Sequence, residues 1–420
     1  MTEQASDNLG LVPKRRFPEF RDDGEWVATP LRQLCTPISE KVGNAKLTPV
    51  SITAGKGFVS QASKFGRDIS GEQYRKYTYL RTGDFAYNKG NSTAFPQGYV
   101  CQLTEFDEAA ASSAFLCFQL HDEHQPRFLQ ALFDQNVHGR QLASFITSGA
   151  RSNGLLNIRS DDFYGVKLSI PPESAEQKKI ADCLSSLDAM IAGETEKLAA
   201  LRNHKKGLMQ QLFPAEGETI PRLRFPEFAN AADWEERPLG EIATYQNGKA
   251  YEPHIVEAGR YIVVNARFIS TDGVVKKWSN NPLLIATKDD ILMVLSDLPN
   301  GKALAKCCRV DEDEKYAVNQ RIARLTPHAA RSDFLFPVLN RHPYLLSFND
   351  GINQTHLSKD NVLTCPIFIP ADEEEQIAIA DCIASVERKI AAQVDLLCEL
   401  DAHKSGLMQQ IFPSPSEATA

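Results

Sequence analysis

Side chains suited to recognising a nucleic acid are concentrated in several turn-rich segments of this sequence. The amides of asparagine and glutamine and the hydroxyl of serine supply the donors and acceptors that base edges require, while lysine and arginine neutralise phosphates. The first set comprises Lys56, Lys64, Arg67, Asn88, Lys89, Asn91, Ser92, Arg151, Ser152 and Asn153. The second set comprises Asn265, Arg267, Lys302, Asn319, Gln320, Arg321, Asn353, Gln354 and His356. Arg151 and Gln354 are the leading candidates, because each lies in a polar segment that precedes the last expected strand of its region.

These residues also have a purely structural interpretation. Lys64 and Arg67 are compatible with a solvated surface, and Asn88 and Asn91 with the shaping of a turn. The pair Asn319-Gln320 is compatible with a role in bracing the fold. The residue types alone therefore leave open which of these side chains contact a ligand.

Common catalytic and cofactor motifs are missing from the sequence. It has no G-x-x-x-x-G-K-[ST] phosphate loop, no H-E-x-x-H, no GxSxG, and no glycine-rich turn suited to S-adenosylmethionine. Asn281-Pro282 is followed by Leu283, so the Asn/Asp-Pro-Pro-aromatic tetrapeptide of amino-methyltransferases is absent too. His121 and His124 lie in a polar turn, and we interpret them as solvated. The sequence favours recognition over catalysis, with no metal or cofactor bound by this chain.

The composition is that of a globular protein in a reducing compartment. The nine cysteines are scattered without any CxxC pair, which predicts neither disulfides nor a zinc site. No stretch approaches the roughly 20 apolar residues of a membrane helix, and no signal peptide is recognisable. We therefore expect a cytoplasmic protein without membrane contact. The chain carries a net charge of −8, yet residues 41–170 carry +3 and residues 241–369 carry +1, which permits DNA binding.

An internal repeat is the strongest signal in the sequence. Arg16-Phe-Pro-Glu-Phe20 recurs 208 residues later as Arg224-Phe-Pro-Glu-Phe228, and Trp26 recurs as Trp234. Gly207-Leu-Met-Gln-Gln-Leu-Phe-Pro214 recurs 199 residues later as Gly406-Leu-Met-Gln-Gln-Ile-Phe-Pro413. The two halves share their edges but differ in their interiors. A repeat this long indicates a duplicated domain rather than a solenoid.

Each half ends in a segment that we expect to form one long helix. Prolines precede residues 174 and 373, Ser174 with Gln177 and Asp372 with Glu375 suggest capping boxes, and Pro214 and Pro413 end the helices. Apolar residues recur at alternating intervals of four and three, which is the heptad pattern. Such a helix is about 60 Å long and needs a partner along its narrow apolar stripe. We expect the two helices to pair antiparallel; the alternative is that each packs only on its own domain.

These features predict an α+β fold with a pseudo-two-fold internal repeat. Two globular mixed α/β domains would be separated by two long antiparallel coiled-coil helices. The expected segments are a flexible N-terminus (1–15), domain 1 (16–172), the first helix (173–215), domain 2 (216–370), the second helix (371–413) and a flexible tail (414–420).

The repeated motifs resemble the specificity subunit of type I restriction-modification enzymes. They are Pro-Lys/Arg-x-Arg-Phe-Pro-Glu-Phe before a tryptophan, Glu-Gln-x-x-Ile-Ala-Asp near each helix start, and Gly-Leu-Met-Gln-Gln-Leu/Ile-Phe-Pro at each helix end. The run from Tyr316 to Leu325, with Asn319-Gln320-Arg321 at its centre, also resembles a recurrent run of these recognition domains. The resemblance extends from about Pro13 to Pro413, although domain 1 has no clean copy of that last run.

The resemblance implies a non-catalytic subunit of a restriction endonuclease and DNA adenine methyltransferase complex. Two target-recognition domains would each recognise one half of a bipartite, asymmetric site in double-stranded DNA. The helices would set the spacer and bind two methyltransferase subunits, and translocase-nuclease subunits would join for cleavage. S-adenosylmethionine, ATP and magnesium would belong to those partners.

Three alternatives remain open on the sequence alone. The chain could serve a methylation-only or other restriction-type system, it could be a stand-alone methyltransferase or nuclease, or it could be a structural coiled-coil adaptor. The missing methyltransferase motifs argue against the second alternative, and the slight positive charge of both interiors argues against the third.

Overall fold

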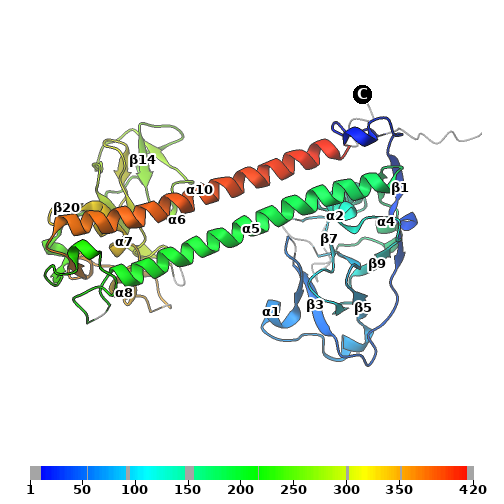
Figure 1. The fold of residues 1–420 in the computed structure, drawn as a ribbon, viewed down its shortest axis with the longest axis horizontal. Coiled ribbons are helices and arrows are strands. Elements are labelled where there is room, and N and C mark those ends of the chain that lie inside the picture. Colours follow the sequence, from blue (N-terminus) through cyan, green and yellow to red (C-terminus); the bar gives the residue numbers. More distant parts are fainter. Residues whose placement is uncertain are drawn as a thin grey trace, which may run out of the picture. The chain divides into compact units, whose positions relative to one another are not determined.

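The computed structural model describes residues 11–53, 55–90, 95–146, 156–215, 217–298, 302–350 and 352–413 (Figure 1). The described chain divides into two compact units. Unit 1 holds residues up to Thr195 together with those from Asp395 onward, and unit 2 holds Glu196–Val394. Each unit therefore contains one globular domain and a part of each long helix.

Two 39-residue helices, α5 (Ser174–Leu212) and α10 (Glu373–Ile411), form where the heptad pattern predicts them. In unit 1 the start of α5 shares a hydrophobic core with the end of α10, through Ile180, Leu184, Met408 and Ile411. In unit 2 the end of α5 shares a core with the start of α10, through Leu208, Leu212, Ile379 and Ile383. The predicted antiparallel pairing is confirmed within each unit. The alternative is wrong, because the end of each helix packs on the domain of the other half.

The capping boxes predicted at the helix starts are not formed. Ser174 Oγ donates to a backbone carbonyl of the adjoining loop at 2.9 Å, and Gln177 accepts a backbone N–H of the same loop at 3.3 Å. Asp372 does cap α10, since its Oδ1 accepts a backbone N–H of the first turn at 2.9 Å. Glu375, however, binds Arg224. The side chains that would complete the boxes bind the globular domains instead.

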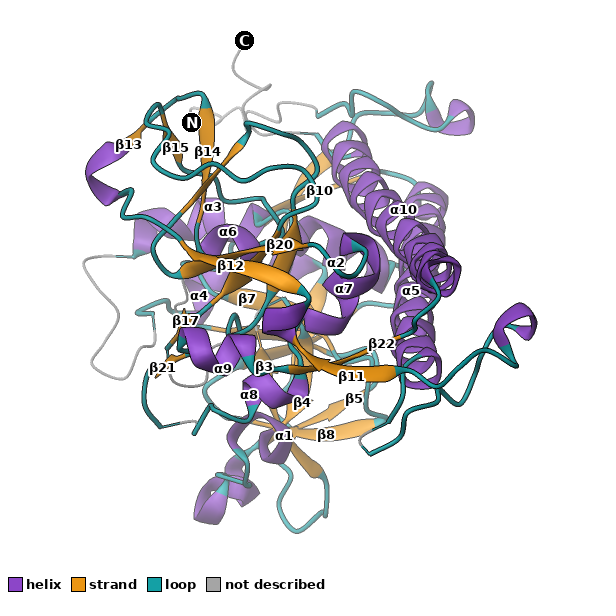
Figure 2. Cartoon of the chain, turned by 90° about the vertical axis from the view of Figure 1, so that its left-hand side faces the viewer, coloured by secondary structure: helices purple, strands orange, loops and turns teal. Residues whose placement is uncertain are grey.

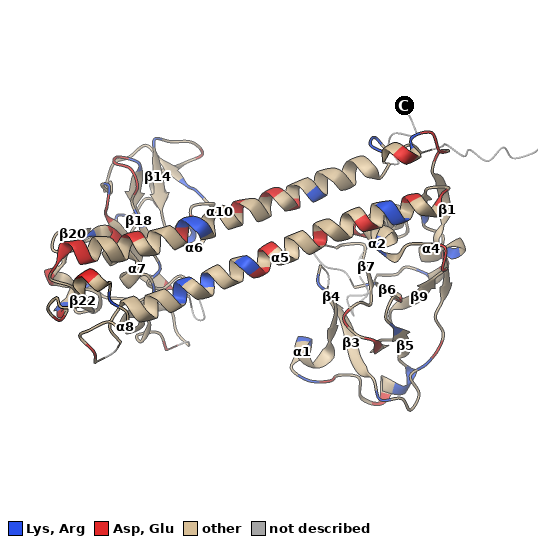
Figure 3. Ribbon diagram, viewed as in Figure 1, with Lys and Arg blue, Asp and Glu red and all other residues tan. Residues whose placement is uncertain are grey.

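The two lysines that interrupt the apolar seams form equivalent ion pairs. Lys205 Nζ lies 2.5 Å from Glu387 Oε1 in unit 2, and Lys404 Nζ lies 2.6 Å from Asp188 Oδ1 in unit 1. Lys404 and Asp188 each lie 199 positions from their counterparts, so the same bridge recurs in both units. Basic and acidic residues lie along both helices (Figure 3). The polar interruptions therefore belong to the pairing of the helices.

We expect these bridges to contribute little to stability. In a double-mutant cycle with Lys205→Met and Glu387→Gln, the coupling free energy should be about 0.2–1 kcal/mol, because both side chains are about one-third exposed to solvent. Urea unfolding of the full chain at low and at high salt measures it, and the coupling should shrink at high salt. As a control, the same cycle with Lys206→Met in place of Lys205→Met should give no coupling free energy with Glu387, because Lys206 is exposed. A coupling above 2 kcal/mol, insensitive to salt, would contradict the prediction.

Domain 1 contains two four-stranded sheets and a short pair of strands. The first sheet has the order β2 (Cys35–Pro37), β9 (Leu116–Leu120), β6 (Phe85–Asn88) and β7 (Tyr99–Gln102). The second has the order β4 (Gly57–Ser60), β3 (Thr48–Thr53), β8 (Glu108–Ala111) and β5 (Thr78–Arg81). The pair is β1 (Val27–Pro30) with β10 (Lys167–Ile170). The α-helices are α1 (Gln61–Phe65), α2 (Pro126–Asp134), α3 (Val137–Leu142) and α4 (Ser160–Tyr164).

Domain 2, which faces the viewer in Figure 2, likewise contains two four-stranded sheets. Its first sheet has the order β12 (Ala243–Asn247), β20 (Ile322–Pro327), β16 (Ile291–Val294) and β18 (Cys307–Arg309). Its second has the order β13 (Ile255–Val256), β15 (Trp278–Ser279), β14 (Tyr261–Val264) and β19 (Tyr316–Val318). Two short pairs are β11 (Glu235–Pro238) with β22 (Pro366–Ile369), and β17 (Ser296–Asp297) with β21 (Thr355–His356). The α-helices are α6 (Ala266–Ser270), α7 (Ser332–Leu339), α8 (Pro343–Leu346) and α9 (Lys359–Leu363).

Each domain has its own first sheet, and the strand order of these two sheets is the same. The strand order of the second sheet differs between the domains. The order β2-β9-β6-β7 corresponds strand by strand to β12-β20-β16-β18. The parallel pair of β3 with β8 corresponds to that of β14 with β19, but the strands around these pairs are arranged differently. Both halves of the duplicated sequence thus form a first sheet with the same strand order. The parts of the sequence that differ between the halves form second sheets that also differ.

The repeated tryptophans and phenylalanines form one aromatic cluster in each unit. In unit 1 the ring of Trp26 lies 5.6 Å from Phe128 and 6.1 Å from Phe412. In unit 2 the ring of Trp234 lies 5.8 Å from Phe334 and 5.9 Å from Phe213. The phenylalanine at the end of each helix therefore anchors that helix on the domain that contains the matching tryptophan.

The backbone repeats the same junction beside each cluster. In unit 2, which contains the link from α5 to domain 2, Leu223 N donates to Gln211 O at 2.9 Å. In unit 1, Arg15 N donates to Gln410 O at 3.0 Å, although those residues come from opposite ends of the chain. The segment before β1 therefore meets α10 as the inter-repeat link meets α5.

A buried arginine–glutamate pair explains two further repeated motifs. Arg16 binds Glu176 through two hydrogen bonds of 2.7 and 2.6 Å, and Arg224 binds Glu375 through two of 2.7 and 2.8 Å. Both glutamate side chains are 1% exposed. Trp234 Nε1 also donates to Glu375 at 3.3 Å. In each half, these motif residues fix the segment before the first strand of the domain to the first turn of the long helix that follows the domain.

Candidate nucleic-acid interface

In domain 2, two segments with predicted site residues meet beyond the end of β16. Leu295, the residue after β16, donates its N–H to Arg321 O at 2.9 Å and accepts the N–H of Leu357 at 2.8 Å. The register of β17 with β21 then places Ser296 opposite His356 and Asp297 opposite Thr355. The turn that contains Arg321 and the polar segment before α9 therefore lie at one edge of the domain.

Domain 1 brings its corresponding segments together in the same way. Lys89, the residue after β6, accepts the N–H of Leu156 at 2.9 Å and donates from Nζ to Ile158 O at 2.8 Å. The predicted residues Asn91, Ser92, Arg151, Ser152 and Asn153 lie outside the described residues, next to these contacts in the sequence. The backbone contact of Leu156 N with Lys89 O thus corresponds to that of Leu357 N with Leu295 O, after the matching strands β6 and β16.

Most predicted site residues in the described part of the chain are exposed. These are Lys56, Lys64, Arg67, Arg267, Lys302, Gln320, Arg321, Asn353, Gln354 and His356. Asn88, Lys89 and Asn265 are half-buried. Asn319 is buried, with 7% of its surface exposed.

Several of the predicted side chains already have partners inside the protein. Asn265 Oδ1 caps α6 by accepting Phe268 N at 2.9 Å, and Asn88 Oδ1 accepts Gly90 N at 2.9 Å. Lys64 Nζ donates to Ile52 O at 2.8 Å, and burial lowers its pKa. These contacts favour the structural interpretation of Asn88. Contacts to a nucleic acid stay a prediction for the whole set.

The leading candidate of domain 2, Gln354, is held at the base of its loop. Its Nε2 donates to Ser296 Oγ at 3.0 Å, across the short β17–β21 pair. Its neighbour Asn353 is bound to Asp350, whose Oδ1 accepts Asn353 N at 2.9 Å. These hydrogen bonds tie Asn353 and Gln354 to neighbouring described residues, and Gln354 remains exposed.

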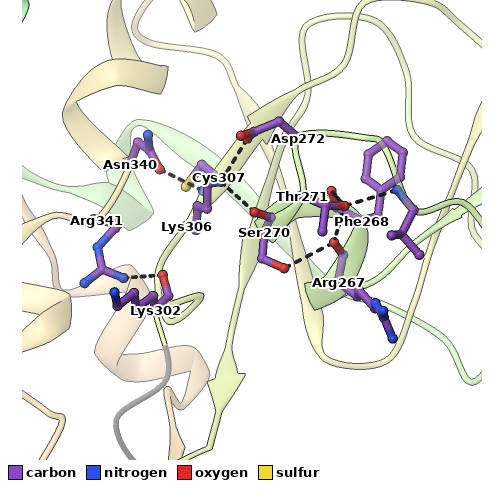
Figure 4. Close-up of polar contacts among 11 residues, drawn as sticks. Arg267, Phe268, Ser270, Thr271, Asp272, Lys302, Lys306, Cys307, Asn340 and Arg341 are labelled. Atoms are coloured by element: carbon purple, nitrogen blue, oxygen red, sulfur yellow. Dashed lines mark hydrogen bonds and ion pairs between the residues drawn. The ribbon is translucent and has the colours of Figure 1, made fainter. Parts of the chain in front are cut away.

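The two predicted cations Arg267 and Lys302 flank a network of polar contacts (Figure 4). Lys306 Nζ donates to Ser270 O at 3.3 Å and pairs with Asp272 at 2.8 Å, which joins the segment after Lys302 to α6. Arg341 donates to Lys302 O at 2.5 Å. The fold uses the backbone of Lys302 and the side chain of Lys306, and leaves the Lys302 side chain exposed.

Two charged residues of this edge escaped the sequence analysis, namely Lys249 and Glu252. Lys249 is exposed and its backbone bridges to Asn319, while Glu252 accepts the Asn319 amide at 3.1 Å. The preceding Gly248 packs so closely on Asn319 that a Cβ would lie 1.8 Å from Asn319 O. The Gly-Lys pair at the end of a strand was the only sequence signal for this close approach.

Neither a metal site nor a membrane span is recognisable among the described residues. No group of three or more His, Cys, Asp or Glu side chains there could hold a metal ion. No helix in the described ranges is both long and apolar enough to cross a bilayer. All nine cysteines are free thiols.

The fold defines a class of protein: duplicated mixed α/β domains that share paired helices. The model of the family described as "Type I restriction modification DNA specificity domain" matches residues 44–203 and 231–400. The chain belongs to this family. The resemblance inferred from the repeated motifs is confirmed, and DNA specificity is the role that the family description carries.

Individual relatives agree with this assignment. The chain is 25% identical over 268 residues to the type I restriction enzyme MjaVIII specificity subunit of Methanocaldococcus jannaschii. That match spans 59% of this chain and 61% of the relative's length. Its fold is similar to the crystal structure of the type I restriction-modification system S subunit from M. genitalium, with a TM-score of 0.60, 16% identity, and coverage of 96% of this chain and 100% of that one.

A second solved structure shares the fold. It comes from a study of complex assembly and conformational transition of the type I R-M system, with a TM-score of 0.51 and 16% identity, and it covers 93% of this chain and 98% of that chain. The predicted fold class is confirmed by these likenesses together with the two matched domains.

Proposed function

We propose that this chain is the DNA specificity subunit of a type I restriction-modification complex, in which each domain recognises one half of a bipartite, asymmetric site. The observation that carries the proposal is the backbone contact that follows β6 in domain 1 and β16 in domain 2. Leu156 N donates to Lys89 O, and Leu357 N donates to Leu295 O, while the polar residues that flank these contacts in the sequence differ between the domains. Different side chains on one scaffold suit two different half-sites.

The proposal assigns the chemistry to partners. Methyltransferase subunits, two per chain, would bind S-adenosylmethionine, and translocase-nuclease subunits would use ATP and magnesium in the cytoplasm. The absence of catalytic motifs from the sequence supports a non-catalytic role. The repeated helices support two equivalent docking surfaces. Buried members of the repeat, such as Arg16 and Glu176, are not available to those partners.

Co-expression of the full chain with its methyltransferase partner tests the proposal. The complex should protect, and methylate, a single bipartite sequence in a random DNA library, whereas a chain in which domain 2 is replaced by a second copy of domain 1 should select a symmetric site. Protection of a continuous sequence would contradict the proposal. Binding without sequence preference would favour the adaptor, and turnover by the chain alone with S-adenosylmethionine or magnesium would favour the stand-alone enzyme.

A further inference from the structure

Asn319 is buried inside domain 2, where both the oxygen and the nitrogen of its side-chain amide form hydrogen bonds. Its Oδ1 accepts Tyr251 N at 3.3 Å, and its Nδ2 donates to Glu252 Oε1 at 3.1 Å. Its backbone N–H donates to Val264 O at 3.2 Å, and the close approach of Gly248 confines its carbonyl. Only 7% of Asn319 is exposed, so its amide is not accessible to a base. It orients Glu252 instead.

Glu252 is an exposed carboxylate among positive charges. It begins the 3-10 turn Glu252–His254, and within the described part of the chain it forms no salt bridge. The hydrogen bond from Asn319 lowers the pKa of Glu252, and the positive charges of Lys277 and Arg321 lower it further. The carboxylate is therefore ionised and held in one orientation.

A carboxylate at this edge is unfavourable for contact with phosphates, which it repels. It suits a different contact, because a carboxylate accepts a hydrogen bond from the N4 amino group of cytosine in the major groove. Gln320 and Arg321 adjoin the residue that holds Glu252 and are exposed, so donors for neighbouring phosphates or bases are available beside it. An oriented acceptor flanked by donors is the arrangement that base recognition requires.

We propose that Glu252 is a specificity-determining residue that accepts a hydrogen bond from a cytosine amino group in the half-site bound by domain 2. The inference rests on the proposed function and deepens it. In domain 1 a serine, Ser112, follows β8 where Asn319 follows β19, and its Oγ accepts Ala114 N at 3.3 Å. The arrangement of Asn319 with Glu252 is thus particular to domain 2, as an asymmetric site requires.

The test uses the complete complex with its methyltransferase subunits and a set of duplexes in which every base pair of the wild-type site is changed singly. With the wild-type complex, one cytosine in the domain 2 half-site should be preferred about 10- to 100-fold, which corresponds to about 1–3 kcal/mol. Glu252→Gln and Glu252→Ala should lose that preference and keep the preferences at all other positions. Glu257→Gln, a change at an exposed acid of the same domain, should alter none of them.

The outcomes separate this inference from the proposed function. If the wild-type complex shows no bipartite preference, the proposed function fails. If it shows one and the Glu252 variants retain the whole profile, or lose all positions uniformly while their thermal unfolding midpoints stay unchanged, the inference is overturned. Glu252→Gln keeps an acceptor for Asn319, so its midpoint should match the wild type. Glu252→Asp keeps the charge but withdraws the carboxylate, and it should lose most of the preference for cytosine.

Discussion

Replacing Glu375 by alanine should destabilise unit 2 by about 3–5 kcal/mol, because the change leaves the Arg224 guanidinium buried without its counter-ion. Arg224 is 9% exposed and directs two hydrogen bonds of 2.7 and 2.8 Å at this carboxylate. Trp234 Nε1 would lose its acceptor as well. Hydrogen exchange of unit 2 peptides in the full chain, combined with urea unfolding, measures the loss.

Two further variants distinguish a buried ion pair from a general effect of charge at the helix start. Glu374→Ala removes an exposed carboxylate one residue away and should cost less than 1 kcal/mol. The double replacement Arg224→Leu with Glu375→Leu should be milder than Glu375→Ala, since it removes both charges together. Equal losses for Glu374→Ala and Glu375→Ala would show that the pair does not act as described.

Acid should destabilise domain 1 through His138. This residue is 1% exposed, and apart from an interaction with the Gly98 backbone its ring nitrogens form no hydrogen bond of ordinary geometry among the described residues. Its ring lies edge-on to Tyr87 and Phe133, at 5.9 and 5.6 Å. Burial lowers the pKa of His138 from its ordinary 6.5 to about 4, since charging the ring there would cost its hydration.

The direction of the effect follows from where the proton binds. Above pH 6.5 the imidazole is neutral in both the folded and the unfolded chain, so its full contribution to stability is present. As the pH falls from 6.5 to 4, the unfolded chain binds a proton that the folded domain excludes. The free energy of unfolding should fall by up to about 3 kcal/mol over this range.

Unfolding of the full chain, measured between pH 7.5 and 4.5, tests this expectation. On acidification, the His138→Leu variant should lose less domain 1 stability than the wild type. The difference should be most of the ~3 kcal/mol assigned to His138. The exposed His328→Leu should leave the pH profile of domain 1 unchanged. Parallel profiles for the wild type and His138→Leu would rule out His138 as the source of acid sensitivity.

The helices and their pairing were predictable because their signals are local. The heptad spacing between Ile180 and Leu212 and the bounding prolines depend only on neighbouring positions in the sequence. The partner of Glu375 was not predictable, since Arg224 lies 151 positions away and only the folded domain brings the two together. Sequence reasoning recognised these residues as a repeat but not as an ion pair, and it gave Glu375 a capping role that it does not have.

The candidate interface was predictable as segments but not as individual side chains. Turn-rich polar composition pointed to the segment around Gln354 in domain 2, while Asn91 and Arg151 in domain 1 lie outside the described residues. It could not distinguish an exposed side chain such as Arg321 from a buried brace such as Asn319, because the two lie within three residues of each other. Glu252 was overlooked because the search favoured cations and amides. Its role depends on an orientation that only the buried Asn319 provides.

The repeated junction in the two units has a consequence for how such genes change. Arg15 N donates to Gln410 O in unit 1 as Leu223 N donates to Gln211 O in unit 2, so each unit contains the same contact between a domain's entry segment and a helix end. Recombination at the two matching segments, which contain Arg15 and Leu223, would exchange one recognition domain for a foreign one. New target sequences would then arise without any change to the helices.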